Sequence, residues 1–428
     1  MATYLFVTFA ITAILGFPIW AVLTTSSFVA LGFASNTPLI VVVQRMFTAT
    51  DSFPSLAVPL FMVAGNLMET GGISRRLINF CNAILGWLPG GLAMAAVLTC
   101  MFFAAISGSG PATVAAIGGI MIPEMEKAGY DKAFAAGVLS VAGAIGVIIP
   151  PSIPMVNFGV TGSVSIANLF AAGFGPGILI GVSLMAVCFV TAKKHGYGMN
   201  SMIKFSVKNL LIEFKNAILA LLMPVIILGG IYGGIFTPTE AAGVAVIYGF
   251  IVGFFIYREI PLKKMAGMFM AAGKSTAMVM MIIAAASGFG WILTSARIPD
   301  AIATAMLTLS SNKIVILLLI NILLLIVGCL LETTAAIIIL TPIFLPIVTQ
   351  LGVDPVHFGI IMVVNLAIGM STPPLGVNLF VACGIAKISI EQIVKAFIWL
   401  LIVNIIDLFV ITYIPAISLA IPRMMGLM

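Results

Sequence analysis

One pattern of helix-breaking residues occurs twice in this 428-residue chain, and each copy lies inside a strongly apolar stretch. The first copy runs from Ser107-Gly108-Ser109-Gly110-Pro111 to Pro150-Pro151, and the second runs from Glu332-Thr333-Thr334 to Pro373-Pro374. Proline and glycine interrupt helices, so the chain must accommodate two equivalent breaks in apolar surroundings. The two copies share five residues at a constant separation of 223 positions, namely Pro123 and Pro346, Gly129 and Gly352, Asp131 and Asp354, Gly146 and Gly369, and Pro150 and Pro373.

The composition places these breaks in a membrane. Hydrophobic residues make up 62% of the chain and charged residues only 7%, whereas soluble domains carry roughly 25% charged residues. The apolar runs are long and continuous, unlike the ~10-residue alternating segments of a transmembrane β-barrel. We therefore predict an all-α integral membrane protein. Secondary transporters form their substrate and ion sites from such repeated pairs of broken helices at membrane depth.

The apolar segments predict nine full spans and two helical hairpins. The hairpins, at about 91–126 and 313–350, are each long enough for two helices but are interrupted at their centres by polar or small residues. Irregular backbone is tolerated at membrane depth only where protein or a wet cavity surrounds it, so we expect re-entrant hairpins that enter and leave on one side. The predicted full spans are 4–32, 54–71, 131–149, 174–192, 216–235, 237–257, 272–294, 354–371 and 395–421.

Positive charges predict the orientation of the chain. Residues 193–215 carry five lysines against one acid, Glu213, and we expect them to form a cytoplasmic connector between a first repeat at 1–192 and a second at 216–428. Counting spans outward from this connector places most other Lys and Arg residues on the same side, as the positive-inside rule requires. The two hairpins then open to opposite sides, so the repeats are predicted to be inverted in topology. The net charge of +6 is a topology signal and implies no nucleic-acid partner.

The first copy of the pattern supplies oxygen atoms suited to a monovalent cation. Pro111, Pro150 and Pro151 cannot donate backbone hydrogen bonds, so nearby carbonyls lose their helical partners. Together with the hydroxyls of Ser107 and Ser109, these carbonyls would form an oxygen cage. Ordinary helix kinks are the alternative interpretation, which the duplication at a fixed separation disfavours.

The second copy supplies the hydroxyls of Thr333 and Thr334, the carbonyls of residues 369–372 and the carboxylate of Glu332. A carboxylate at mid-membrane costs about 2.5–3.5 kcal/mol or more unless it has a partner, so we expect Glu332 to be functional. A structural hydrogen bond to a neighbouring hairpin is the alternative. The sequence assigns no role to Asp407, which lies in the last span.

Na⁺ is the predicted coupling ion, because the chain has only two histidines and its spans contain no ladder of acids for a proton relay. The five cysteines show no CxxC spacing and are expected to be buried apolar residues without metal or disulfide. Paired acids, a nucleophile with its base, and a metal cluster are all lacking from the pattern, so an enzyme is not expected. The first residues lack the basic start of a signal peptide, and we expect the first span to be retained.

Several motifs identify a family resemblance. Ser107-Gly108-Ser109-Gly110, Ile149-Pro150-Pro151-Ser152-Ile153, Phe236-Thr237-Pro238-Thr239-Glu240 and Thr372-Pro373-Pro374-Leu375-Gly376 resemble the large membrane subunit of TRAP transporters, and the resemblance covers the whole chain. It implies a sodium-driven, elevator-type importer of organic acids in a bacterial inner membrane. It also implies two partners, a small four-span membrane subunit and a periplasmic substrate-binding protein.

The resemblance assigns candidate site residues. The Na⁺ ligands it implies are Ser107, Ser109, Gly146, Val147 and Pro150 in the first copy, and Glu332, Thr333, Gly369, Met370 and Thr372 in the second. The candidate substrate-binding residues, for which structural hydrogen bonds are an alternative, are Thr113, Ser152, Asn157, Thr334 and Asn378.

The segment Gly110-Pro111-Ala112-Thr113 lacks an acid that many family members carry there. This favours the sugar-acid branch, sialic acid included, over the C4-dicarboxylate branch. Two rival functions remain open, a stand-alone anion transporter that works without a binding protein and a passive channel or scaffold subunit.

Overall fold

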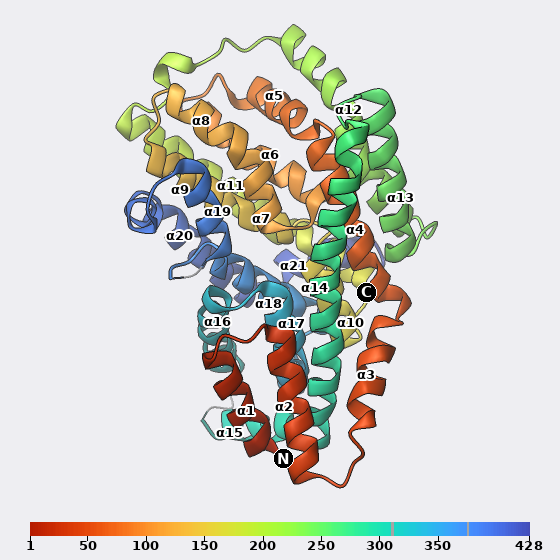
Figure 1. Cartoon of the computed structure of the whole chain (residues 1–428). Coiled ribbons are helices and arrows are strands. Elements are labelled where there is room, and N and C mark those ends of the chain that lie inside the picture. Colours follow the sequence, from red (N-terminus) through yellow and green to blue (C-terminus); the bar gives the residue numbers. More distant parts are fainter. Residues whose placement is uncertain (310–311, 375) are drawn as a thin grey trace.

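The computed structural model describes residues 1–309, 312–374 and 376–428, so Leu375 of the second Pro-Pro motif lies outside the described residues. Within these ranges the protein is all helical and contains no strand. Seven of the described helices are long and apolar enough to cross a membrane, or eight if α3 and the bent segment that follows it form one span. The predicted fold class, an all-α multi-pass membrane protein, is confirmed (Figure 1).

The elements before the first hairpin are α1 (Ala2–Ile14), α2 (Ile19–Ala34), α3 (Ile40–Thr50), the 3₁₀ turn η1 (Phe53–Leu56), α4 (Ala57–Thr70) and α5 (Ile73–Leu85). The first hairpin and its continuation comprise α6 (Gly91–Ser107), α7 (Gly110–Thr113), the π-helical turn η2 (Val114–Gly118), α8 (Gly119–Lys127), α9 (Lys132–Gly143), η3 (Ala144–Val147), α10 (Ile153–Gly162), α11 (Ile166–His195) and η4 (Met199–Ser201). The middle of the chain forms α12 (Val207–Tyr232), α13 (Pro238–Phe250), the π-helical turn η5 (Ile251–Ile256), α14 (Leu262–Ser295) and α15 (Ile298–Leu309). The second hairpin and its continuation comprise α16 (Lys313–Leu330), α17 (Thr333–Gln350), α18 (Pro355–Gly369), α19 (Val377–Ala386), α20 (Ile390–Tyr413) and α21 (Ala416–Met424).

Both predicted hairpin segments are interrupted near their centres, with α6 ending at Ser107 and α16 at Leu330, and the two open ends of each segment are joined by a contact; entry and exit on one side of the membrane stays a prediction. In the first, the loop after α8 carries the buried Tyr130, whose hydroxyl hydrogen-bonds the backbone of Leu92 and Ala93 at the start of α6. Burial raises the pKa of Tyr130 to about 12, so the phenol stays protonated. In the second, Lys313 Nζ donates to the Gly352 carbonyl at 3.2 Å. The open ends lie toward opposite ends of the molecule (Figure 1).

The elements after each hairpin correspond between the two repeats. Helices α9 and α18 begin 223 residues apart, while α10 and α19, like α11 and α20, begin 224 apart. One residue is therefore inserted after the second proline pair. Ser163 and Lys387, which end α10 and α19, are also 224 apart, and both adopt φ 53° in the left-handed region.

The two repeats interlock at the breaks. Helix α10 of the first repeat packs against α17 and α18 of the second. Conversely, α19 of the second repeat packs against α7, η2 and α9 of the first. Each hairpin is therefore held by a half-helix from the other repeat, and the two breaks lie in one shared core.

The structure corrects four of the predicted spans. The predicted span 4–32 is two helices, α1 and α2, packed against each other, because Gly16 (φ 77°) and Pro18 turn the chain between them. The predicted span 395–421 is divided by Ile414-Pro415 into α20 and α21. The predicted spans 131–149 and 354–371 end at Val147 and Gly369. At ~1.5 Å per residue they are too short for a ~30 Å hydrocarbon core, so each is the first half of a broken helix.

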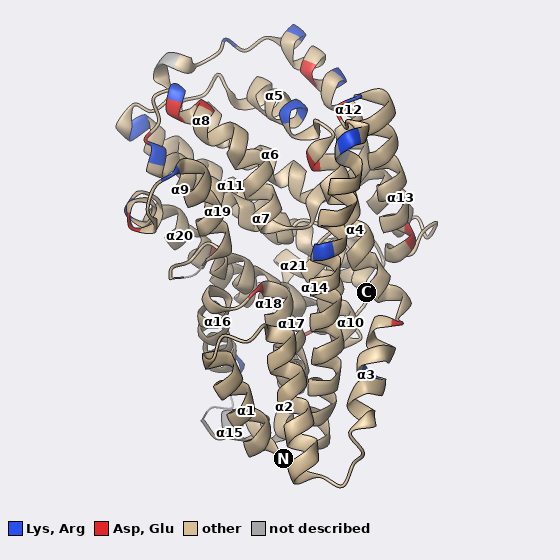
Figure 2. Cartoon of the chain, viewed as in Figure 1, with Lys and Arg blue, Asp and Glu red and all other residues tan. Residues whose placement is uncertain are grey.

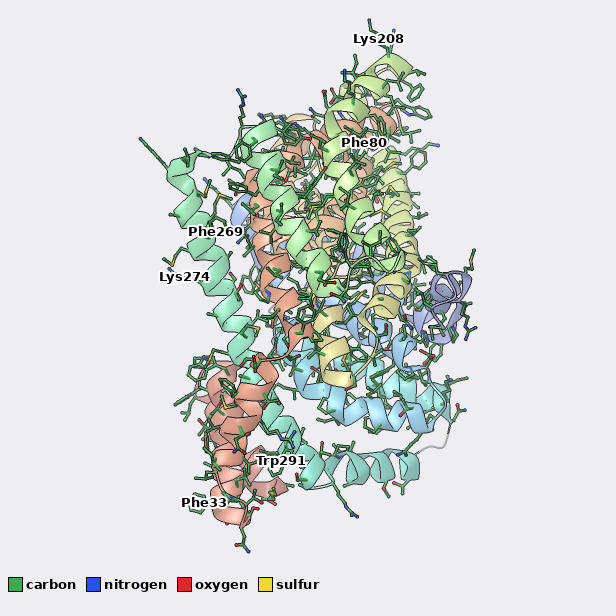
Figure 3. All side chains as sticks on the ribbon, turned by 90° about the vertical axis from the view of Figure 1, so that its right-hand side faces the viewer. Phe33, Phe80, Lys208, Phe269, Lys274 and Trp291 are labelled. Carbon is green, nitrogen blue, oxygen red and sulfur yellow. The ribbon has the colours of Figure 1, made fainter. Side chains whose placement is uncertain are left out.

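Charge is distributed unevenly along the molecule. Figure 2 shows Lys and Arg gathered at the end that contains α5, α8 and the start of α12, and few of them around α1, α2 and α15. We expect the basic end to face the cytoplasm. Lys274, which lies inside the predicted span 272–294, is exposed on α14 and points away from the rest of the molecule between the levels of Lys208 and Phe33 (Figure 3).

Candidate functional site

The tip of the first hairpin gathers hydroxyl and carbonyl oxygens. Helix α6 ends at Ser107, Gly108 turns the chain with φ 59°, and the extended Ser109 leads into α7. Thr113 Oγ1 donates to the Ser109 carbonyl at 2.8 Å and lies 3.0 Å from Ser107 Oγ. The structure thus brings Ser107 and Ser109 together, and it adds Thr113, predicted to bind substrate, to the same cluster.

The first broken helix passes directly beside this tip. A Cβ placed on Gly146 would lie 2.5 Å from Thr113 Oγ1 and 2.7 Å from the Ser109 carbonyl oxygen, so only glycine allows so close an approach. Beyond the break, Ser152 Oγ donates to the Val147 carbonyl at 2.5 Å and caps α10. The Ile153 amide donates to the Gly108 carbonyl at 3.4 Å. Six predicted residues therefore adjoin one another, and Pro150 lies buried within the same break. The six are Ser107, Ser109, Thr113, Gly146, Val147 and Ser152.

The second tip is built differently. Helix α16 ends at Leu330, and Glu332 is the N-cap of α17, its Oε2 accepting from the Ala335 amide at 3.1 Å. The partner of Glu332 is thus its own hairpin's backbone, and the residue is exposed. Thr333 and Thr334 are buried behind it, and Thr333 Oγ1 has no hydrogen-bond partner within the described part of the chain. A carboxylate at a helix N-terminus is favourable by itself, so the cap does not require an ion.

The second broken helix presses against the second hairpin. A Cβ on Gly369 would lie 2.5 Å from the carbonyl carbon of Gly328, in the last turn of α16. After α18 ends, Thr372 Oγ1 donates to the Ile368 carbonyl at 2.8 Å. The Met370 carbonyl accepts from the Asn378 amide at 2.9 Å. A carbonyl oxygen has two lone pairs, so Met370 keeps one acceptor position beyond this bond.

Two candidate substrate-binding residues, Asn378 and Asn157, lie on the half-helices that pack against the other repeat. Asn378, at the start of α19, donates through Nδ2 to the Ser140 carbonyl of α9 at 3.3 Å. It also lies beside Gly110 of the first hairpin, where an added Cβ would be 3.1 Å from Asn378 Oδ1. Asn157, in the first turns of α10, belongs to the helix that packs against α17 and α18. Asn378 therefore lies beside the first hairpin, and Asn157 lies on the helix that packs against the second.

Several buried polar atoms around the breaks have no partner within the described residues, namely Thr333 Oγ1, Asn378 Oδ1, Ser140 Oγ and both side-chain heteroatoms of Asn157. Buried polar groups in native proteins are nearly always satisfied, so these atoms mark room for water, an ion or a ligand. Neutral oxygens dominate, and no three His, Cys, Asp or Glu side chains of the described chain form a metal cluster. Hydroxyls and carbonyls of this kind fit a hard monovalent cation better than a transition metal.

The sequence did not identify Ser140 as part of the site. Its carbonyl accepts from both Ser371 Oγ, at 2.8 Å, and Asn378 Nδ2. Ser140 is a single serine inside an apolar helix, and nothing in its spacing distinguishes it. Only the packing of α19 across α9 gives it a role.

These features define a class of protein, a multi-pass membrane transporter with two interlocked broken-helix repeats. The family model described as "Tripartite ATP-independent periplasmic transporter, DctM component" matches residues 5–417. The chain belongs to this family and is therefore a TRAP transporter large permease subunit of a bacterial inner membrane.

Named relatives support the assignment. The chain is 50% identical over 415 residues to the isethionate TRAP transporter permease protein DctMQ of Oleidesulfovibrio alaskensis, covering 97% of this chain and 65% of that protein. It is 43% identical over 383 residues to the C4-dicarboxylate TRAP transporter large permease protein DctM of Pseudomonas aeruginosa, covering 90% and 89% of the two chains. It is 36% identical over 400 residues to the sialic acid TRAP transporter large permease protein SiaM of Vibrio cholerae, covering 93% of each.

A solved structure shares the fold. The YdaH transporter of Alcanivorax borkumensis superposes with a TM-score of 0.61 over 95% of this chain and 97% of that one, at 16% sequence identity. This likeness concerns the architecture alone.

Proposed function

We propose that this subunit imports a small organic anion and that a Na⁺ gradient drives the import. The observation that carries the proposal is the pair of equivalent breaks, each next to a hairpin tip and each bordered by buried polar atoms that have no partner among the described residues. Breaks of this kind can hold an ion and a carboxylate close together, because freed carbonyls and helix N-termini lie side by side.

We propose two Na⁺ positions. Ser107, Ser109, Gly146, Val147 and Pro150 would hold one ion, with the Thr113 hydroxyl beside it. Glu332, Thr333, Gly369, Met370 and Thr372 would hold the other. When bound, Na⁺ supplies positive charge that offsets the charge of an anionic substrate. The Glu332 carboxylate then has two partners, its own helix N-terminus and the cation.

The substrate is proposed to be a small carboxylate or sulfonate. The relatives' names include isethionate, C4-dicarboxylates and sialic acid, with identities of 50%, 43% and 36%. The predicted preference for sialic acid depended on the segment at 110–113, and the order of identities favours the smaller anions. Sialic acid remains the alternative substrate. The proposed contacts to the substrate, whichever anion it is, are the buried residues Ser152, Asn157, Thr334 and Asn378.

The transport cycle is proposed to be of the elevator type. The hairpins and the broken helices cross-pack through α10 on α17 and α19 on α7, which favours movement as one unit against the remaining helices. The proposed partners are a small four-helix membrane subunit and a periplasmic substrate-binding protein, because the family is that of a tripartite transporter.

The test separates the charge of Glu332 from its capping role. Glu332→Gln keeps an oxygen that can accept from the Ala335 amide, so the melting temperature of the purified subunit should stay unchanged. In proteoliposomes that contain both partner proteins, the Glu332→Gln variant should lose the uptake that a Na⁺ gradient drives. The control is Asp354→Asn, since Asp354 caps α18 through the Val356 amide at 2.8 Å, and this variant should transport normally. Wild-type uptake that persists after Na⁺ is replaced by K⁺ would refute sodium coupling.

The rivals give different results in the same assay. A stand-alone transporter would accumulate substrate without the binding protein. A channel would equilibrate substrate but show no counterflow. Tripartite import predicts that omission of either partner abolishes uptake.

A further inference from the structure

A second polar cluster lies away from the two breaks, between α11 and α20. Asp407 lies in the C-terminal half of α20 and is 5% exposed. Its Oδ1 accepts from Ser183 Oγ of α11 at 3.1 Å, while its Oδ2 is buried without a partner within the described chain. One turn earlier on α20, Asn404 is 1% exposed, and both of its side-chain heteroatoms also lack described partners.

The cluster lies where the repeats meet. Ser183 and Asp407 are 224 positions apart, the same separation as the starts of α11 and α20, so equivalent positions of the two repeats are in contact. The equivalent of Asn404 is the buried Ile180. The two repeats therefore contribute different side chains at equivalent positions. The second repeat supplies an acid and an amide, and the first supplies a serine and an isoleucine.

No described counter-charge reaches Asp407. Lys193 lies ten residues along α11 from Ser183, and Lys395 lies twelve residues along α20 from Asp407, which correspond to about 15 and 18 Å of helix. The described ion pairs join other residues, Arg76 to Glu259 and Lys132 to Glu126. Within the described chain, no ionisable group on the elements that pack around α20 forms a hydrogen bond or ion pair with Asp407. These groups are Lys132 on α9, Cys188, Lys193, Lys194 and His195 on α11, His357 on α18, Cys383 on α19, and Glu391, Lys395 and Tyr413 on α20 itself.

An ionised carboxylate buried without a cation is strongly disfavoured. A neutral carboxylic acid, by contrast, has an O–H to donate. Asn404 lies three residues before Asp407 and so on the same helix face, where its Oδ1 has no donor among the described residues. Protonation at Oδ2 would make the buried carboxyl neutral and give it a donor on the buried, unpartnered oxygen, while Ser183 continues to donate to Oδ1.

We propose that Asp407, Asn404 and Ser183 form a proton-binding site at the interface of the two repeats, occupied at neutral pH and distinct from the sodium positions. The site binds one proton on Asp407 Oδ2 and returns it to water when the carboxyl ionises. Ionisation would leave an unpaired charge between α11 and α20. The protein should therefore be stable while the acid is protonated and should lose stability, and uptake with it, as the pH rises through the ionisation of Asp407.

Infrared spectroscopy of the purified subunit in lipid tests the proton directly and does not depend on transport. The wild-type-minus-Asp407→Asn difference spectrum at neutral pH should contain one carboxylic-acid C=O band, and Ser183→Ala should shift that band. Glu391→Gln, at an exposed carboxylate on the same helix, should remove only carboxylate bands. A difference spectrum for Asp407→Asn that contains only carboxylate bands would overturn the proposal.

A second experiment measures uptake and therefore rests on the proposed function. It distinguishes a proton bound at Asp407 from a metal cation bound there. Asn mimics the neutral acid, so Asp407→Asn should transport like the wild type at neutral pH and should keep its uptake at alkaline pH, where the wild type loses activity. Loss of uptake at neutral pH in a variant with the wild-type melting temperature would show that the negative charge is required, and the proton site would be wrong. If wild-type uptake proved independent of Na⁺, the infrared result would still stand.

Discussion

The contact between Gly369 and Gly328 sets the position of the second hairpin, and Gly369→Ala tests it. The new Cβ would lie 2.5 Å from the Gly328 carbonyl carbon and 2.6 Å from its Cα. Non-bonded carbons settle at about 3.5–4.0 Å, so the last turns of α16 and α18 must separate by about 1 Å. Both contacted atoms belong to the backbone, and no rotamer change can relieve the overlap.

The expected cost follows from this displacement. Overpacking a core costs about 1–3 kcal/mol, and the better helix propensity of alanine returns only about 0.5–1 kcal/mol. Gly328 lies one turn before Glu332, so the movement reaches the proposed ion position. A misplacement of about 1 Å can lower a rate by roughly 10²-fold, and we expect a loss of that order in Na⁺-driven uptake.

The assay compares Gly369→Ala with Gly384→Ala, in α19, where an added Cβ meets no atom within 4 Å. Both variants are purified, melted in detergent and reconstituted with the two partner proteins. Gly369→Ala should melt at a lower temperature and need more Na⁺ for half-maximal uptake, and Gly384→Ala should match the wild type. If the two variants behave alike, the close approach of α16 and α18 does not position the site.

Three further outcomes are expected. Thr113→Val keeps the shape of the side chain but removes the hydroxyl that donates to the Ser109 carbonyl; the Na⁺ concentration for half-maximal uptake should rise, and an unchanged value would remove Thr113 from the ion site. Asp131→Ala deletes the side-chain cap on the Phe134 amide, which is bonded at 2.8 Å, and should lower stability by about 1 kcal/mol in a chemical denaturation series without changing sodium dependence. Lys274→Gln removes an exposed charge from α14 (Figure 3). Because a cation facing lipid is costly, we expect Lys274 to pair with an acid of the small subunit. Copurification of that subunit should therefore weaken in Lys274→Gln and stay intact in the control Lys208→Gln.

Much of the architecture could be predicted from local pattern. The constant separation of proline, glycine and aspartate located both broken helices, and the interruptions inside the apolar segments at 91–126 and 313–350 located the helix ends at Ser107 and Leu330. These predictions succeeded because helix breaking is a local property of proline and glycine. Two of the four wrong spans, 4–32 and 395–421, failed for a local reason as well, because a single turn at Pro18 or Pro415 divides an otherwise continuous apolar run.

The composition of the site was less accessible. Asn378 was predicted only as a substrate-binding residue, whereas its side chain also bonds the Ser140 carbonyl of the first repeat. Such a contact depends on how α19 crosses α9, and no spacing rule within one repeat encodes it. Asp407 could be seen in the sequence as a charge in a span, but its contact with Ser183 could not.

The amino-acid order alone determined that this chain lives in a bilayer, that it contains two copies of one broken-helix unit, and to which family it belongs, because apolar length and helix breaking act over neighbouring residues. Tertiary packing alone decided which oxygens converge, since the half-helix after each break leaves its own hairpin and packs on the other. That exchange joins residues more than 200 positions apart, a separation over which local preference carries no information.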